Sequence, residues 1–125
     1  MTRALVLFAH GARDARWAEP FEAVAERVRR AEPTLAVRLA FLEMMTPTLG
    51  EAVDALAAEG GSEVDVVPLF LGTGGHLRKD LPPLVDAVRA AHPALVIRLH
   101  AAIGEHDAVL DAMARASLDA AGFGE

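Results

Sequence analysis

Cysteine is absent from the 125 residues, so the chain forms no disulfide bond and offers no thiolate to a metal ion. Any bound metal must be held by histidine and carboxylate side chains. No apolar run approaches the roughly 18–20 residues that a membrane-spanning helix needs. The N-terminus also lacks the basic and apolar regions of a secretory signal. We therefore expect a cytoplasmic protein with no membrane segment.

Positive charge is also scarce: 12 lysine and arginine residues oppose 18 aspartate and glutamate residues, which leaves a net charge of −6. This excess disfavours nucleic acid as a partner, because a duplex would be repelled on average. Four of the basic residues nevertheless cluster in two pairs, Arg13 with Arg16 and Arg78 with Lys79. Each pair lies close to a histidine and forms either ordinary surface charge or a positive rim for an anionic ligand.

Hydrophobic residues make up 53% of the chain, and their pattern indicates one domain that spans residues 1–125. Apolar runs predict four buried strands, at Arg3–Ala9, 35–42, 64–70 and 95–100. Apolar residues spaced three and four apart predict four helices, at 15–31, 47–59, about 77 or 81 to 91, and 105–121. This alternation predicts an α/β fold with a parallel sheet covered by helices on both faces. By analogy with flavodoxin-like folds we expect the strand order 2-1-3-4, with the switch point between the first and third strands.

Local signals predict where the helices begin and end. Thr46 and Pro47 are suited to the N-cap and first residue of the second helix. The third helix contains Pro82 and Pro83, which a helix tolerates only in its first turn. Gly122 is expected to cap the last helix.

Two histidines stand out because each follows a buried strand and adjoins a glycine-containing turn. His10 ends the first strand, and His76 follows the third strand through the loop LGTGGH. Glu43 and His100 end the second and fourth strands. Ligands of open α/β sheets bind at the carboxyl ends of the strands beside the switch point, so His10 and His76 are expected to flank that crevice. Imidazole and carboxylate suit Co²⁺, Fe²⁺, Ni²⁺ or Zn²⁺, and a neutral imidazole also accepts protons.

Each of these residues also has a purely structural interpretation. A histidine at a strand end often bonds only to the backbone, and Glu43 just before a helix favours the helix dipole. The glycines at 72, 74 and 75 allow either a tight turn or a close approach of the backbone to a ligand. Neither GxxxxGK[ST] nor GxGxxG is present, so no nucleotide is expected. The roles of His100 and His106 stay open.

Three stretches, FAHGARDARW, AFLEMMTPTL and PLFLGTGGHLRKDLP, resemble the signature segments of the class II tetrapyrrole chelatases. The chain is most similar to the short sirohydrochlorin chelatases of the CbiX/SirB type, and the resemblance covers nearly all of it. One departure is Ala12, which stands where the family usually has serine and removes a hydroxyl near the site. Longer members contain two such domains, so the resemblance implies a homodimer that rebuilds the pair.

The resemblance implies that the chain inserts Co²⁺ or Fe²⁺ into sirohydrochlorin without ATP, for cobalamin- or siroheme-type cofactors. The metal is then a substrate, and the ligand set also accepts Ni²⁺. In this interpretation His10 and His76 bind the metal and accept protons, and Glu43 is the acidic residue of the site. The residues implied to contact the tetrapyrrole are Leu71, Gly72, Thr73, Gly74 and Gly75 through their backbone, and Arg13, Arg16, Arg78 and Lys79 through its carboxylates.

Two alternatives from other classes are weaker. A histidine phosphatase opens with Arg-His-Gly, and Ala9 stands here where the arginine belongs. A metal or tetrapyrrole carrier without catalytic activity usually has dense histidine or cysteine tracts, which this sequence lacks. The sequence leaves open whether the pocket lies within one subunit or between two.

Overall fold

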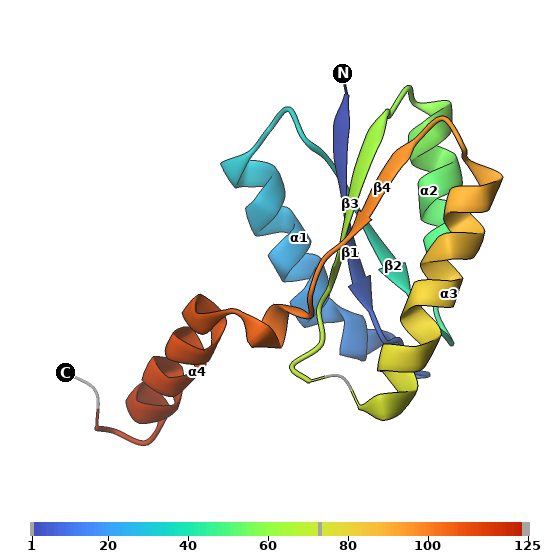
Figure 1. The fold of residues 1–125 in the computed structure, drawn as a ribbon. Coiled ribbons are helices and arrows are strands. Elements are labelled where there is room, and N and C mark those ends of the chain that lie inside the picture. The colour runs from blue at the N-terminus through green and yellow to red at the C-terminus, as the bar shows by residue number, and fades with distance from the viewer. Residues whose placement is uncertain (1, 73, 124–125) are drawn as a thin grey trace.

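The computed structural model describes residues 2–72 and 74–123, apart from the side chain of His76. Its four strands are β1 (Arg3–Ala9), β2 (Ala36–Phe41), β3 (Glu63–Pro68) and β4 (Val96–Leu99). Its helices are α1 (Glu19–Ala31), α2 (Leu49–Ala58), α3 (Gly75–Ala91) and α4 (Asp107–Ala120), with short 3₁₀ turns η1 (Ala15–Ala18) and η2 (Ile103–Glu105). The strands are all parallel in the order β2-β1-β3-β4, which confirms the predicted order (Figure 1).

Alternation along the strands divides the core between the two faces of the sheet. Val6 and Phe8 of β1 pack with the buried residues of α2 and α3. Leu5 and Leu7 face the other way and join the cluster that α1 covers. Because all four strands are parallel, their carboxyl ends meet at one edge, the lower edge of the sheet in Figure 1.

The start of α2 differs from the expectation. Its N-cap is Thr48, whose Oγ1 accepts from the Glu51 N–H at 3.2 Å, while Glu51 Oε1 accepts from the Thr48 N–H at 2.8 Å. The prediction of a cap at Thr46 was therefore wrong by two residues. This reciprocal capping box needs a carboxylate or amide three residues after the cap, and Leu49 at that distance from Thr46 has none.

Helix α3 also differs, because it begins at Gly75 and holds Pro82 and Pro83 beyond its first turn. Each proline lacks the N–H that would bond to the carbonyl four residues earlier. Both prolines are exposed, so water can hydrate those carbonyls, while the neighbouring Leu81 and Val85 are buried in the core. Packing of the buried side therefore holds the helix together across the two prolines.

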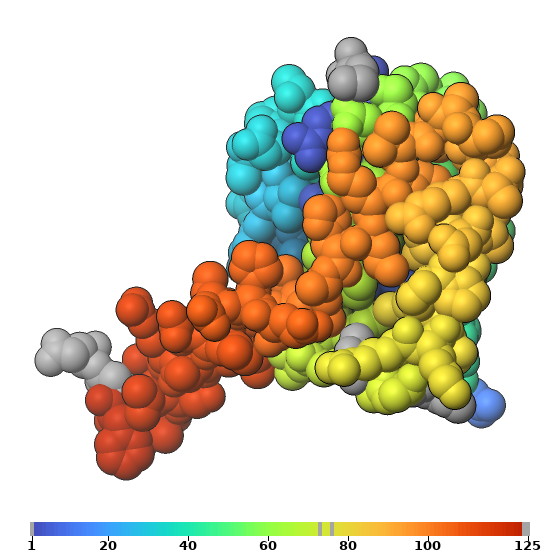
Figure 2. Space-filling model, in the orientation of Figure 1, coloured from blue at the N-terminus to red at the C-terminus, as the bar shows by residue number. Residues whose placement is uncertain are grey.

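Helix α4 leaves the body of the molecule, as Figure 2 shows for the red C-terminal segment. None of its residues is buried. The helix ends at Ala120, and Gly122, the glycine expected at this end, has a φ of +84° and donates its N–H to the Asp119 carbonyl at 3.1 Å. Among the described residues, none of the helices combines the length and the apolar character that crossing a bilayer requires.

Candidate metal site at the carboxyl edge of the sheet

His10 and Glu43 are brought together by an extension of the β1–β2 ladder. The Leu42 N–H donates to the Ala9 carbonyl at 2.9 Å, and the Glu43 N–H donates to the His10 carbonyl at 3.0 Å. The contact between the two chains thus continues to His10, one residue beyond β1, and to Glu43, two residues beyond β2. Glu43 is fixed beside His10, although 33 positions separate them in the sequence.

Gly11 makes this close approach possible. Its φ of +97° lies in the left-handed region, and a Cβ at this position would lie 1.8 Å from the Glu43 carbonyl oxygen. No residue with a side chain can occupy the position unless the turn moves. The glycine after the histidine is therefore a structural requirement of the His10–Glu43 pair.

The hydrogen bonds of the His10 ring define its chemistry. Nδ1 lies 3.2 Å from the Gly11 carbonyl oxygen, which only accepts, so Nδ1 carries the hydrogen in this bond. In the neutral ring Nε2 then presents a lone pair, and it lies 3.3 Å from Glu43 Oε2. A lone pair that faces a carboxylate is stabilised by a proton or a cation between the two atoms. Both side chains are about half exposed, at 48% and 49%, so a proton or a cation can reach the pair from solvent.

The separation of these two atoms also suits a metal ion. Ligands of a tetrahedral ion such as Zn²⁺, bound at about 2.0–2.1 Å, lie about 3.3–3.4 Å apart. The Nε2–Oε2 distance is 3.3 Å. The separation of the pair therefore matches that of two ligands of one metal ion, and nitrogen with oxygen is a ligand set that first-row divalent metals accept.

An aromatic cluster supports the turn that carries His10. The rings of Trp17 and Phe21 lie in contact, with centroids 4.6 Å apart and planes tilted by 37°, and together with Met45 they pack against buried Ala18 and Phe41. The cluster joins η1 and α1 to the segment after β2. Both sides of the His10–Glu43 pair therefore lie on one apolar support.

The structure brings together only part of the set that the sequence predicts. The side chain of His76 and the whole of Thr73 lie outside the described residues. His100 Nε2 is 2.8 Å from Asp65 Oδ1, so this ring is engaged elsewhere. Among the described side chains, no three His, Asp or Glu residues lie close enough to form a complete metal site.

Asp65 is the centre of a network that sequence reasoning missed. Its carboxylate is buried in β3 and accepts from Arg3 at 2.8 Å, from His100 at 2.8 Å and from Arg98 at 3.3 Å. Burial alone would raise the pKa of the Asp65 carboxyl, but these hydrogen bonds outweigh it and lower the pKa to about 2. Arg98 also donates to Glu63, and this bond raises the pKa of the Arg98 guanidinium.

A charged residue within the buried run VDVVPLF was the available signal for this network, because a buried carboxylate needs partners. The remaining histidines are peripheral. His92 Nε2 lies 2.6 Å from Asp54 Oδ1 and links α3 to α2, while His106 precedes α4 without a side-chain capping bond.

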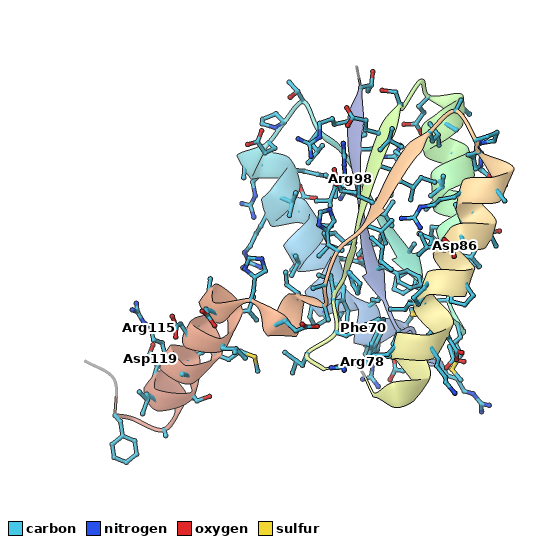
Figure 3. The ribbon with its side chains drawn as sticks, viewed as in Figure 1. Phe70, Arg78, Asp86, Arg98, Arg115 and Asp119 are labelled. Carbon is cyan, nitrogen blue, oxygen red and sulfur yellow. The ribbon has the colours of Figure 1, made fainter. Side chains whose placement is uncertain are left out.

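The basic residues differ in their surroundings. Arg13, Arg16 and Lys79 are all exposed, and Arg16 pairs with Asp14 at 2.8 Å. Arg78 of α3, which is labelled in Figure 3, contributes to a hollow of about 310 Å³ beside the ends of β3 and β4. A second hollow, of about 700 Å³, is lined by Thr2, Arg3 and Asp65 at the opposite end of the sheet. The smaller hollow therefore lies at the carboxyl edge, beside β3 and β4, and neither His10 nor Glu43 is among its lining residues.

Comparison with known proteins identifies the family of the chain. The CbiX family model matches residues 4–120, so the chain belongs to the CbiX family. A sirohydrochlorin cobaltochelatase from Methanosarcina barkeri is 35% identical over 63 residues, which are 50% of this chain and 48% of that protein. The chain thus matches about half the length of this curated relative.

Solved structures extend the similarity to the whole fold. A putative cobalamin biosynthesis CbiX protein from Marinobacter aquaeolei is 34% identical with a TM-score of 0.84, and the match covers 94% of this chain and 95% of that one. SirB from Bacillus subtilis with Fe³⁺ is 26% identical with a TM-score of 0.81. That match covers 95% of this chain but 47% of SirB, so SirB is about twice as long. A SirB structure in complex with cobalt is 27% identical with a TM-score of 0.77, covering 95% of this chain and 51% of that one.

Proposed function

We propose that this chain is a sirohydrochlorin chelatase, which inserts Co²⁺ or Fe²⁺ into the tetrapyrrole without ATP. The observation that carries the proposal is the His10–Glu43 pair, in which Nε2 and Oε2 lie 3.3 Å apart at the carboxyl edge of the sheet. Membership of the CbiX family supports the same reaction. The relative from Methanosarcina barkeri is a sirohydrochlorin cobaltochelatase, and the SirB structures contain cobalt or iron.

Metal insertion has two chemical requirements, and the residues of the proposed site can meet both. The ion must be held weakly enough to be released to the ring, and two N–H protons must leave the tetrapyrrole. A half-exposed imidazole and carboxylate bind a divalent ion openly, with other positions left for water or substrate. Once the ion moves to the ring, His10 Nε2 and Glu43 can each accept a proton. His76 completes the proposed metal-binding pair with His10.

The tetrapyrrole carries several carboxylates, so its binding requires positive charge near the site. Arg13 and Arg78 supply this charge in our proposal, and guanidinium groups bind carboxylates in a bidentate manner. The backbone of Leu71, Gly72, Gly74 and Gly75 lines the pocket. Arg13 and Arg78 locally offset the net charge of −6, which would otherwise disfavour an anionic substrate.

A second copy of the chain is the proposed partner. The match covers about half of SirB, and a second copy of the chain would supply a second unit of the matched size. Helix α4 supports this assignment: Leu110 and Met113 on one side of the helix are 50% and 45% exposed. An amphipathic helix with no buried residue is typical of a surface that another protein covers.

The reaction is tested by anaerobic absorption spectroscopy of sirohydrochlorin with Co²⁺, Fe²⁺ or Ni²⁺, with and without enzyme. We expect the wild-type chain to accelerate insertion, His10→Ala to abolish the acceleration, and Glu43→Gln to reduce it at least about 10-fold. Circular dichroism checks that both variants fold. Rates equal to those without enzyme would contradict the proposal, and binding of the tetrapyrrole without insertion would indicate a carrier instead.

A further inference from the structure

Met44 has a backbone conformation that residues with a side chain seldom adopt. Its φ is +65°, and within the described part of the chain it is the one residue other than glycine with a positive φ. In this left-handed region the Cβ of an L-residue comes too close to the following carbonyl oxygen. Glycine avoids the contact, and asparagine tolerates the region better than methionine does. A methionine at this position therefore lowers the stability of the fold.

Packing does not compensate for this conformation. The neighbouring apolar residues are partly buried: Leu42 packs against the core beneath α2 and α3, and Met45 packs in the aromatic cluster with Trp17 and Phe21. Met44 belongs to neither cluster and is 59% exposed. Backbone outliers of this kind are concentrated at ligand-binding sites. The conformation of Met44 therefore calls for an explanation outside the core.

Met44 lies at the candidate metal site. It directly follows Glu43, so the Cα atoms of the two residues are about 3.8 Å apart. The Glu43 N–H donates to the His10 carbonyl at 3.0 Å, and this bond fixes the segment beside the imidazole. A methionine side chain is long and flexible, so it can contact a molecule that is bound at the His10–Glu43 pair.

A second exposed apolar residue, Leu71, lies on the other side of β1. The Leu69 N–H donates to the Phe8 carbonyl at 2.7 Å, so the chain after β3 continues beside β1, and Leu71 follows with an exposed fraction of 60%. In the order β2-β1-β3-β4, His10 is thus flanked by Met44 after β2 and Leu71 after β3. Neighbouring strands are about 4.8 Å apart, so a flat ligand about 10 Å across would reach both side chains.

We infer that the side chains of Met44 and Leu71 contact the apolar face of the tetrapyrrole and hold the ring over the His10–Glu43 pair. The inference rests on the proposed function for the identity of the substrate. A tetrapyrrole is a flat, largely apolar macrocycle with its carboxylates on the periphery. Basic residues can bind that periphery, but the face of the ring needs apolar contacts, and the polarisable thioether of methionine adapts to such a surface.

The test is Met44→Asn, which removes the apolar side chain and suits the left-handed backbone. The midpoint of urea unfolding should therefore rise. The dissociation constant for metal-free sirohydrochlorin, measured by calorimetry, should rise at least about 10-fold, because the apolar contact with the ring is lost. A gain in stability with a loss of substrate binding is not expected of a residue whose role is structural. Wild-type affinity, or a lower urea midpoint, would overturn the inference.

Two control variants accompany Met44→Asn. Met44→Leu keeps an apolar side chain of similar volume and should bind sirohydrochlorin within about 2-fold of wild type. Val24→Asn removes an apolar side chain that is 39% exposed on α1, away from the carboxyl edge, and should bind like wild type. Equal losses in Met44→Asn and either control would contradict an apolar contact at Met44.

Co²⁺ binding without tetrapyrrole separates contact with the ring from an effect on Glu43. Met44→Asn should leave the affinity for Co²⁺ unchanged, whereas Glu43→Gln should weaken it. Equal weakening by the two changes would show that Met44 acts through the position of Glu43, and would overturn the inference. Light scattering should find the same oligomer for Met44→Asn and wild type. A different oligomer would assign the exposed side chain to a contact between copies of the chain instead.

Leu71→Asn provides an independent variant if Met44→Asn does not fold. It should weaken sirohydrochlorin binding in the same way, and wild-type affinity in this variant would overturn the inference. If the wild-type chain binds sirohydrochlorin but inserts no metal, the proposed function fails, and the comparison of affinities still decides the roles of Met44 and Leu71. If the wild-type chain does not bind sirohydrochlorin, both are wrong.

Discussion

Two carboxylates at the residue scale show how surroundings decide what a side chain can do. Glu43 is half exposed beside one imidazole, so its charge is available to a cation. Asp65 is 8% exposed and already accepts hydrogen bonds from Arg3, Arg98 and His100. Asp65 therefore stabilises the sheet, whereas Glu43 belongs to the candidate site.

This assignment of Asp65 predicts how acid affects stability. Its carboxyl has a pKa of about 2 in the folded chain and an ordinary value of 3.8. The folded state thus favours the charged form, and the resulting stabilisation is fully present above about pH 4 and is lost as the pH falls towards 2. It amounts to about 2 kcal/mol. Urea unfolding followed by circular dichroism at several pH values should show this loss in wild type and not in Asp65→Asn.

Asp14→Asn is the control for this experiment. Its hydrogen bonds from Arg16 also lower the pKa of the Asp14 carboxyl, but the side chain is 55% exposed and solvent screens the pair. We expect its acid profile to follow that of wild type closely. A parallel fall of wild type and Asp65→Asn between pH 4 and 2 would show that Asp65 does not carry the effect.

Strand order allowed the sequence to predict which residues lie at the same edge of the sheet. The sequence did not predict the direction in which each of these side chains points. Parallel strands end at one edge, so His10 and Glu43 could be expected together from their places after two apolar runs. His100 also ends a strand, but it lies on the same face as Arg98 and Asp65, because side chains two residues apart share a face.

At the element scale, the alternation of apolar runs and helical spacing predicted the order, the direction and the approximate bounds of the strands. These features follow from periodicity, which is local. The helix starts were less predictable, because several residues in a row can serve as a cap. Thr46 and Thr48 both precede a helix, and only the reciprocal bonds between Thr48 and Glu51 distinguish them.

This difference gives a direct test of the start of α2. Thr48→Ala removes a side-chain cap and one half of the capping box, so it should lower the free energy of unfolding by about 1 kcal/mol. Thr46→Ala changes the same residue type two positions earlier and should have little effect. Urea unfolding of both variants is the measurement, and an equal loss in the two would contradict the observed cap.

At the scale of the whole molecule, α4 is distinctive because none of its residues is buried. It contacts η2 and then extends away from the sheet, as Figure 1 shows. One side of the helix carries Val109, Leu110 and Met113, while Asp107, Asp111 and Asp119 lie on the other. The helix is therefore amphipathic without a surface of its own chain to cover, which is the physical basis for the proposed homodimer.

A pair of variants on opposite sides of α4 tests the homodimer. Leu110→Glu combined with Met113→Glu puts charge on the apolar side, and burial of each side chain is worth about 1.5–3 kcal/mol. The dissociation constant should rise by at least about 100-fold, so light scattering should find a dimer of the 13.2 kDa wild-type chain and a monomer of the double variant. Ala108→Glu adds one negative charge on the opposite side and should remain dimeric. A wild-type monomer, or equal weakening by both changes, would contradict the role of α4. Insertion activity in a stable monomer would further show that one copy of the chain holds a complete site.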